Sequence, residues 1–214
     1  TSPNEVILIG AHYDTAGFDK KNLSMVHGAA QPGADNNASG VAAALTIINT
    51  LSELDLKKTV RVVFFDFGEI GFLGSYDYTK SMRVNKQENI YTYVELLMLG
   101  HDTQSLDKEG KTGNMKLYYT PKSKQIAQEL KASSDHGTFR ASFTPFEKDF
   151  LNGDNVSFQG IDIPTVVYTQ NWESDFNADR IHTPGDHVSS LNTVTLHHAT
   201  NNIAMAIASW ALDL

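Results

Sequence analysis

The sequence contains no cysteine. This absence excludes disulfide bonds, thiolate zinc sites and catalysis by a cysteine nucleophile, and it leaves the redox compartment undecided. Long hydrophobic runs are also missing. The longest apolar stretch in a helical pattern, residues 41–48, is far shorter than the roughly 20 residues needed to cross a bilayer. We therefore expect no membrane-spanning segment, and no signal peptide is visible in the chain as given.

Clusters of basic residues are absent as well. The chain has 17 Lys and Arg against 25 Asp and Glu, which gives a net charge of −8. A nucleic acid or an anionic membrane would be repelled at long range by this charge. We therefore predict no nucleic-acid partner and no membrane partner.

What the sequence does contain is enough apolar material for one core. The 214 residues are 41% hydrophobic and 20% charged, which is typical of a single globular domain spanning 1–214. The chain starts at Thr1 and reaches an apolar run at Val6. We interpret this start as a processed or trimmed N-terminus.

Apolar patterns predict that strands and helices alternate along the chain. Several strands are continuous apolar runs, as in sheets buried on both faces. A polar segment at 10–37 is expected to be a loop. The predicted strands are 5–9, 59–65, 90–99, 115–119 and 164–169, and the predicted helices are 38–54, 72–82, 121–133 and a last helix around 196–210. This order indicates an α/β fold, with a mostly parallel sheet between two layers of helices.

Histidines and carboxylates follow the predicted strands, where ligands bind in such folds. Imidazole and carboxylate without thiolate form the ligand set of a catalytic zinc or a similar divalent ion. Each pair alone also fits a solvated loop, a turn or a helix cap. The remaining histidines are interpreted as surface or loop residues. The strand-end residues are His12, Asp14, Asp66, Glu69, His101, Asp102, His182 and Asp186.

Four segments, taken together, are typical of one family. They are VILIGAHYDT at 6–15, PGADNNASG at 32–40, VVFFDFGEIGFLGS at 62–75 and IHTPGD at 181–186. In this order and spacing the chain closely resembles the two-zinc aminopeptidases of peptidase family M28. The resemblance implies a phosphorylase/hydrolase-like three-layer α/β/α sandwich with a mostly parallel mixed sheet, and zinc-dependent removal of N-terminal residues from peptides. It also favours a secreted or periplasmic location.

The resemblance assigns metal ligands and their supporting residues by position. The ligands would be His12, Glu69 and His182. Asp14 and Asp186 would be the carboxylates that support them.

Three family positions carry different residues here. The carboxylate that bridges the two zinc ions falls on Asn36, the general base falls on Gly68, and a further carboxylate ligand falls on Leu97. Asp35 and Glu95 are the nearest substitutes as ligands, with Glu95 expected on the same face of its strand as Leu97. We therefore expect at most one tightly bound zinc or other divalent ion, or none, and no confident catalytic residue.

Two classes of function stay open at this point. One is a metallo-aminopeptidase, weak or inactive because the base is missing, a group typically worth 10²–10⁴ in rate. The other is a pseudoenzyme that binds peptides or has a structural role; an engineered chain or a fragment is a third interpretation. Family members also have an N-terminal segment ahead of the first histidine strand. Its absence would expose a strand edge and favour self-association.

Overall fold

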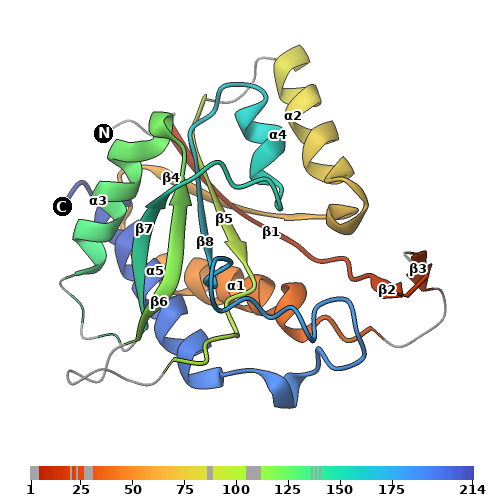
Figure 1. Cartoon of the computed structure of the whole chain (residues 1–214). Helices are drawn as coiled ribbons and strands as arrows, with labels where there is room; N and C mark the ends of the chain where they lie inside the picture. The colour runs from red at the N-terminus through yellow and green to blue at the C-terminus, as the bar shows by residue number, and fades with distance from the viewer. Residues whose placement is uncertain are drawn as a thin grey trace.

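The sheet at the centre of the computed structural model has the strand order β4-β1-β5-β8-β6-β7 (Figure 1). The structure describes residues 5–19, 21–22, 24–26, 31–85, 89–104, 112–135, 137, 139 and 141–214. The strands are β1 Glu5–His12, β4 Thr59–Phe65, β5 Asn89–Leu97, β6 Thr112–Tyr119, β7 Ala141–Glu147 and β8 Thr165–Thr169. Only β6 and β8 pair in antiparallel fashion among these strands. The predicted mixed, mostly parallel sheet is confirmed.

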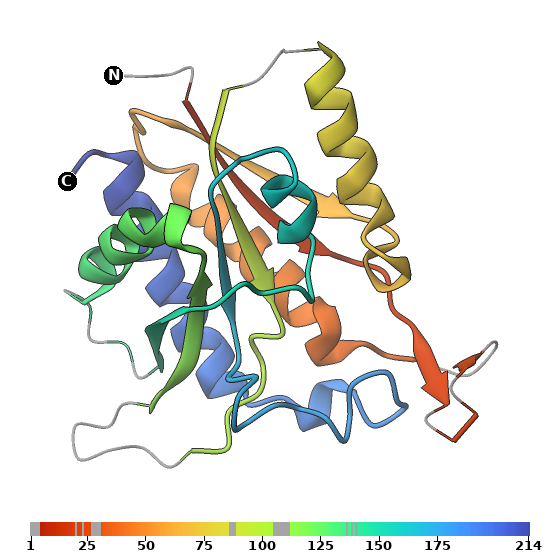
Figure 2. The ribbon, with the colours of Figure 1, turned by 45° about the horizontal axis from the view of Figure 1, so that its top comes forward.

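Helices cover both faces of the sheet (Figures 1 and 2). On one face lie α1 Gly40–Leu51, α3 Lys124–Ser134 and α5 Thr193–Ala211, and on the other lie α2 Leu73–Asn85 and α4 Asn155–Gln159. The predicted three-layer α/β/α sandwich is therefore confirmed. Among the described residues, no helix combines the length and the apolar character that a membrane crossing requires.

Strand β1 explains why the sheet is buried on both sides. Successive side chains of a strand point to opposite faces. Ile7 and Ile9 pack into the core beneath α1, α3 and α5, whereas Val6 and Leu8 pack into the core beneath α2 and α4. A continuous apolar run is therefore what this central strand needs, and its carboxyl end at His12 is held in a fixed place.

Four elements differ from the sequence-based expectation. The segment 10–37, predicted as a loop, contains the hairpin β2 Gly17–Asp19 and β3 Ser24–Val26. Strand β7 and helix α4 were not predicted. Strand β7 contains Pro145, a residue that strands accept mainly at sheet edges, and β7 is indeed an edge strand.

Strand β4 forms the other edge of the described sheet. Unlike β7, it contains no proline, the residue that would oppose pairing with a further strand at this edge. Self-association through a strand edge stays a prediction.

Candidate functional site

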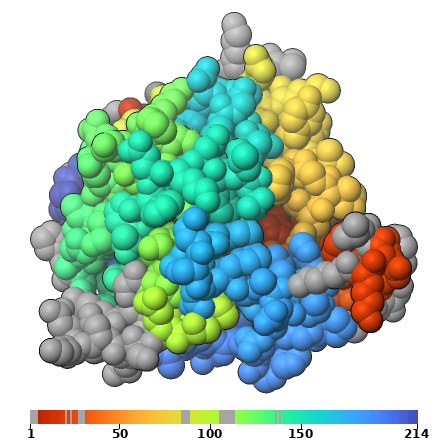
Figure 3. Space-filling view, in the orientation of Figure 1, coloured from red at the N-terminus to blue at the C-terminus, as the bar shows by residue number. Residues whose placement is uncertain are grey.

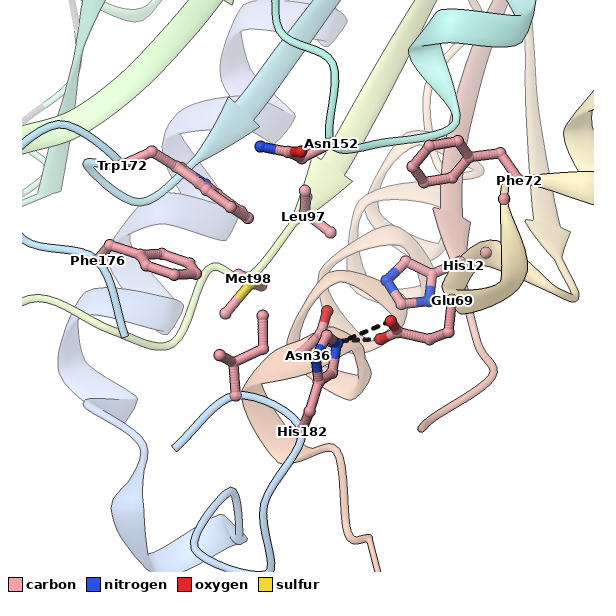
Figure 4. Close-up of a pocket in the computed structure, with 13 residues that line it drawn as sticks. His12, Asn36, Glu69, Phe72, Leu97, Met98, Asn152, Trp172, Phe176 and His182 are labelled. Atoms are coloured by element: carbon pink, nitrogen blue, oxygen red, sulfur yellow. Dashed lines mark hydrogen bonds and ion pairs between the residues drawn. The ribbon is translucent and has the colours of Figure 1, made fainter. Parts of the chain in front are cut away.

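A cavity of about 390 Å³ opens at the carboxyl ends of β1 and β5. In the space-filling view, the red of β1 is visible at the bottom of a hollow between α2 and the blue segment near residue 180 (Figure 3). Four residues assigned from the sequence line this cavity together: His12, Asn36, Glu69 and His182 (Figure 4). They come from four separate parts of the chain, which meet because parallel strands end on the same side of the sheet.

His12 is the last residue of β1, and Asp14 holds it from one side. The Nδ1 atom of His12 lies 3.3 Å from the Asp14 carboxylate. That carboxylate also accepts hydrogen bonds from the backbone N–H of Gly68, at 2.8 Å, and of Glu69, at 3.0 Å. Asp14 therefore ties the end of β1 to η2, the short 3₁₀ helix Gly68–Ile70 that follows β4. Its role as the carboxylate that supports a metal ligand stays a prediction.

Electrostatics keep the buried His12 ring protonated. Burial alone would lower its pKa, but the hydrogen bond to Asp14 and the negative charges of Glu69, Asp154 and Asp14 outweigh burial and raise the pKa to about 9. In Asp14 burial raises the pKa, and the hydrogen bonds from His12 and the two backbone N–H groups more than reverse this, so its pKa is lowered. The two residues form an ion pair in the neutral range of pH.

Glu69 is the centre of the polar side of the cavity. One of its carboxylate oxygens, Oε2, lies 2.8 Å from Nε2 of His182. The other, Oε1, accepts a hydrogen bond from the side-chain amide of Asn36 (Figure 4). Asn36 thus presents its N–H₂ group to Glu69 as a donor.

Asp186 positions Asn36 through the backbone. Its carboxylate accepts hydrogen bonds from the N–H of Asp35, at 2.8 Å, and from the N–H of Asn36, at 2.9 Å. Both residues belong to η1, the π-helical segment Ala34–Ser39. Asp186 therefore holds the backbone of η1 beside the cavity, and its role as a carboxylate that supports a metal ligand stays a prediction.

Asp35, a substitute ligand in the sequence analysis, is used elsewhere. Its carboxylate accepts hydrogen bonds from the N–H of Gly100, at 2.8 Å, and from the side chain of Asn177, at 2.9 Å. It is buried and does not line the cavity. Burial raises its pKa above the ordinary value for an aspartate.

Glu95, the other substitute, also does not line the cavity. Its two carboxylate oxygens accept hydrogen bonds from the N–H of Asp154, at 2.9 Å, and of Asn155, at 2.8 Å, where α4 begins. Burial and the neighbouring charge of Asp154 raise the pKa of Glu95 to about 8. This side chain anchors α4 to β5 in the described structure.

The opposite side of the cavity is apolar and was not predicted from the sequence. Trp172 and Phe176 stack with ring centroids 4.2 Å apart, and both line the cavity with Leu97 and Met98 (Figure 4). Trp172 is fixed by donating a hydrogen bond from Nε1 to Thr169, the last residue of β8. The sequence did contain a signal for this side, because Trp172 closely follows the end of the strand at 165–169.

Left-handed backbone conformations collect around the cavity. Phe67, Phe72, Met98 and His182 have φ values between 51° and 60°, a region that residues other than glycine seldom adopt. Such strain persists where the surrounding structure holds it, and it is concentrated at functional sites. Phe72, Met98 and His182 line the cavity directly.

The remaining strand-end residues have structural partners. His101 lies 3.3 Å from the Asp175 carboxylate, and Asp102 accepts a hydrogen bond from Asn114 at 3.1 Å. Asp66 accepts a hydrogen bond from the N–H of Phe67. None of these three lines the cavity.

The donor atoms present do not fit a two-zinc centre. In the described part of the chain, no three His, Asp or Glu side chains are grouped so that they could hold a metal ion. Asn36 donates to Glu69 instead of bridging, and Leu97 has no donor atom. Glu69 and His182 form the closest pair of assigned ligands. Glu69 and His182 could together bind a single ion. The number of ions bound stays a prediction.

A sequence model of peptidase family M28 matches residues 1–207. Curated relatives include leucine aminopeptidase 2 of Trichophyton rubrum, 25% identical over 99% of this chain and 43% of the relative. The probable leucine aminopeptidase 2 of Aspergillus fumigatus is 23% identical over 99% of this chain and 42% of the relative. The chain therefore spans less than half the length of these relatives.

Solved structures share the fold. LapA of Legionella pneumophila superposes with a TM-score of 0.75 at 22% identity, over 98% of this chain and 54% of that one. The zinc aminopeptidase of Bacillus subtilis gives 0.75 at 19% identity, over 98% and 47%. The gamma-secretase component Nicastrin gives 0.76 at 21% identity, over 98% and 40%. The family model that matches residues 1–207 shows that the chain belongs to peptidase family M28.

Proposed function

We propose that this chain binds the N-terminal residue of peptides in the cavity at His12 and Glu69 and does not hydrolyse them at a useful rate. One observation carries the proposal: position 68, where the family resemblance places the general base, is a glycine against which His12 is packed. A Cβ atom added to Gly68 would lie 2.6 Å from Cβ of His12. No carboxylate can occupy this position while His12 stays where it is.

The two sides of the cavity suit the two parts of an N-terminal residue. An α-ammonium group is largely protonated at pH 7, and the Glu69 carboxylate is the group that would accept its hydrogen bonds. Leu97, Met98 and the stacked Trp172 and Phe176 would surround an apolar side chain. A volume of about 390 Å³ is within the usual range for small-ligand sites and has room for a side chain such as leucine.

The comparisons support a peptidase ancestry and also include a protein of another description. Curated relatives are named leucine aminopeptidases, which is consistent with an apolar first residue. One structure with the same fold is titled a component of gamma-secretase rather than an aminopeptidase. The fold therefore occurs both in zinc aminopeptidases and in a component of gamma-secretase.

Tryptophan fluorescence offers a direct test of binding. Trp172 lines the cavity, whereas Trp210 packs on Tyr91, so Trp210→Phe leaves one tryptophan as a reporter. We expect a leucine-initiated tripeptide amide to change this fluorescence saturably, and the N-acetylated peptide to bind at least about tenfold more weakly because it has no charge for Glu69. Equal binding of the two peptides would refute the proposal.

Matched variants test the role of Glu69. Glu69→Gln should weaken binding of the free peptide but not of its acetylated form, whereas Glu53→Gln, at an exposed position, removes the same charge without effect. In parallel, turnover of leucine p-nitroanilide and the zinc content are measured. Robust cleavage that a chelator abolishes would overturn the proposal in favour of a metallo-aminopeptidase.

A further inference from the structure

A second cavity, of about 340 Å³, lies beside the first, between helices α2 and α4. Gly71 and Phe72 line both cavities, so one wall separates them. Figures 1 and 2 show α4 beside α2 on the same side of the sheet. The two cavities are therefore neighbours that meet at Gly71 and Phe72.

The second cavity is basic on one side. Lys80 and Arg83, one turn apart on α2, both line it and are exposed. Within the described residues neither cation forms an ion pair, not even with Asp77 on the same helix. Two exposed cations one turn apart make this side of the cavity locally positive in a chain with a net charge of −8, and their chemistry selects a carboxylate or another anion.

Apolar side chains connect the basic side to the first cavity. Tyr76 lines the second cavity and is 59% exposed, and Leu73, also on α2, is 50% exposed. Large apolar side chains gathered on one exposed face mark an interaction surface. The surface between the two cavities is therefore suited to the body of an extended peptide.

From these observations we propose that the second cavity binds an acidic residue further along the same peptide whose N-terminal residue occupies the first. This inference rests on the proposed function and names its ligand class: peptides with an apolar first residue and a downstream Asp or Glu. The carboxylate would contact Lys80 and Arg83, and the intervening residues would lie over Phe72 and Tyr76.

The dimensions of α2 set the spacing. Helix α2 begins at Leu73, directly after Phe72, and from that residue Lys80 lies about 10 Å and Arg83 about 15 Å along the helix. An extended peptide covers this distance in about four or five residues. Since the first two residues of the peptide are needed to reach Phe72, the acidic residue is expected at about position 6.

The experiment uses leucine-initiated octapeptide amides of Gly and Ala residues with one Glu. The Trp210→Phe chain reports binding through Trp172, at low salt. We expect the peptide with Glu at position 6 to bind about fivefold more tightly than its Gln counterpart, as two exposed ion pairs allow. Glu at position 3 should give no such gain, and added salt should remove it.

Variants separate this inference from the proposed function. Lys80→Gln with Arg83→Gln should abolish the preference for Glu at position 6 and leave binding of the Gln peptide unchanged. Lys57→Gln with Lys124→Gln, both exposed and outside the two cavities, should keep the preference. If leucine peptides bind with no preference for Glu, the inference fails while the proposed function stands. If no leucine peptide binds, both fail.

Inorganic phosphate serves as the probe for a site that takes any anion. We expect millimolar phosphate to leave the affinity of the Gln peptide unchanged. It should reduce the tighter binding of the Glu peptide only as much as sodium chloride of equal ionic strength does. A stronger, saturable loss with phosphate would overturn the peptide assignment in favour of a free-anion site.

Discussion

His12 occupies the space into which a side chain at position 68 would point. An ideal Cβ on Gly68 would lie 2.6 Å from Cβ and 2.7 Å from Cγ of His12, distances well below those of real contacts. The Cβ atom of His12 is fixed by the backbone, so rotation of the side chain does not move it away. His12 itself is fixed at the end of β1 by Asp14. The glycine and the histidine are therefore one packing unit.

The first prediction is that Gly68→Ala destabilises the protein. The added methyl group must displace His12, and such overpacking costs about 1–3 kcal/mol of unfolding free energy. Urea denaturation followed by circular dichroism measures this change. Gly160→Ala is the control, because its Cβ would meet no atom closer than 3.5 Å and its φ is −61°. Equal stability of the two variants would show that His12 moves freely.

The second prediction concerns pH. The folded state raises the pKa of His12 from 6.5 to about 9 and that of Glu95 from 4.5 to about 8. For both groups, the folded state then binds more protons than the unfolded state across these intervals, so stability falls as the pH rises. We expect the unfolding free energy to decrease by at least about 2 kcal/mol between pH 6 and pH 9.

A matched pair of variants assigns this pH dependence. Glu95→Gln removes one of the two titrating groups, so its unfolding free energy should fall less steeply between pH 6 and 8. Glu53→Gln, at an exposed site, should keep the slope of the parent chain. A parent chain that gains stability from pH 6 to 9 would contradict the argument.

The third prediction is that Asn36→Asp makes stability depend on zinc. In the parent chain the Asn36 amide donates a hydrogen bond to Glu69. An aspartate there places two carboxylates side by side, which should lower the unfolding free energy by about 1–3 kcal/mol in the presence of a chelator. Added zinc should reverse the loss by binding the folded state.

Thermal unfolding with and without zinc measures this effect. Asn49→Asp, on the exposed side of α1, adds the same charge away from the cavity and should show no zinc dependence. The parent chain should contain at most one zinc per molecule by elemental analysis. Two equivalents in the parent chain would contradict our interpretation of Asn36.

Much of the fold could be predicted from the sequence because apolar runs have a direct structural meaning. Strand 59–65 is predicted with both ends correct, and β1 is recognised although it extends to His12. Strand β7 could not be predicted because Pro145 argues against a strand, and only its place at the sheet edge makes the proline acceptable. That place depends on how distant strands pair, which local patterns do not contain.

The candidate site could also be predicted only in part from the sequence. The order of motifs placed His12, Glu69 and His182 near each other, and the structure brings them to one cavity. The sequence could not tell that Glu95 is used to hold the start of α4, because alternation gives the side of a strand but not the partner. It also could not reveal the contact between His12 and Gly68.

The last prediction concerns the recovery of catalysis. Asn36→Asp with Leu97→Asp should raise the zinc content towards two per chain, because these changes supply the bridging charge and the missing ligand. We expect no cleavage of leucine p-nitroanilide by this double variant, since it still lacks a base. Addition of Gly68→Glu should raise cleavage about 10- to 100-fold over the background rate of the double variant. This gain is smaller than a general base usually gives, because the new side chain must first displace His12.

If the residues at 36, 68 and 97 limit catalysis together, the effects of the single substitutions on cleavage should not add up to the effect of the triple variant. Gly68→Glu alone should be inactive, because a base without activated water has no proton to accept, and groups that act as a unit show such behaviour. Leu97 is only 2% exposed, so circular dichroism and zinc content are measured on each variant to separate failed folding from failed catalysis. If Gly68→Glu alone cleaves the substrate, Asn36 and Leu97 do not limit activity, and if the parent chain does so in a chelator-sensitive way, none of the residues at 36, 68 and 97 does. The N-terminal residue of a peptide would then be cleaved in this cavity rather than only held there.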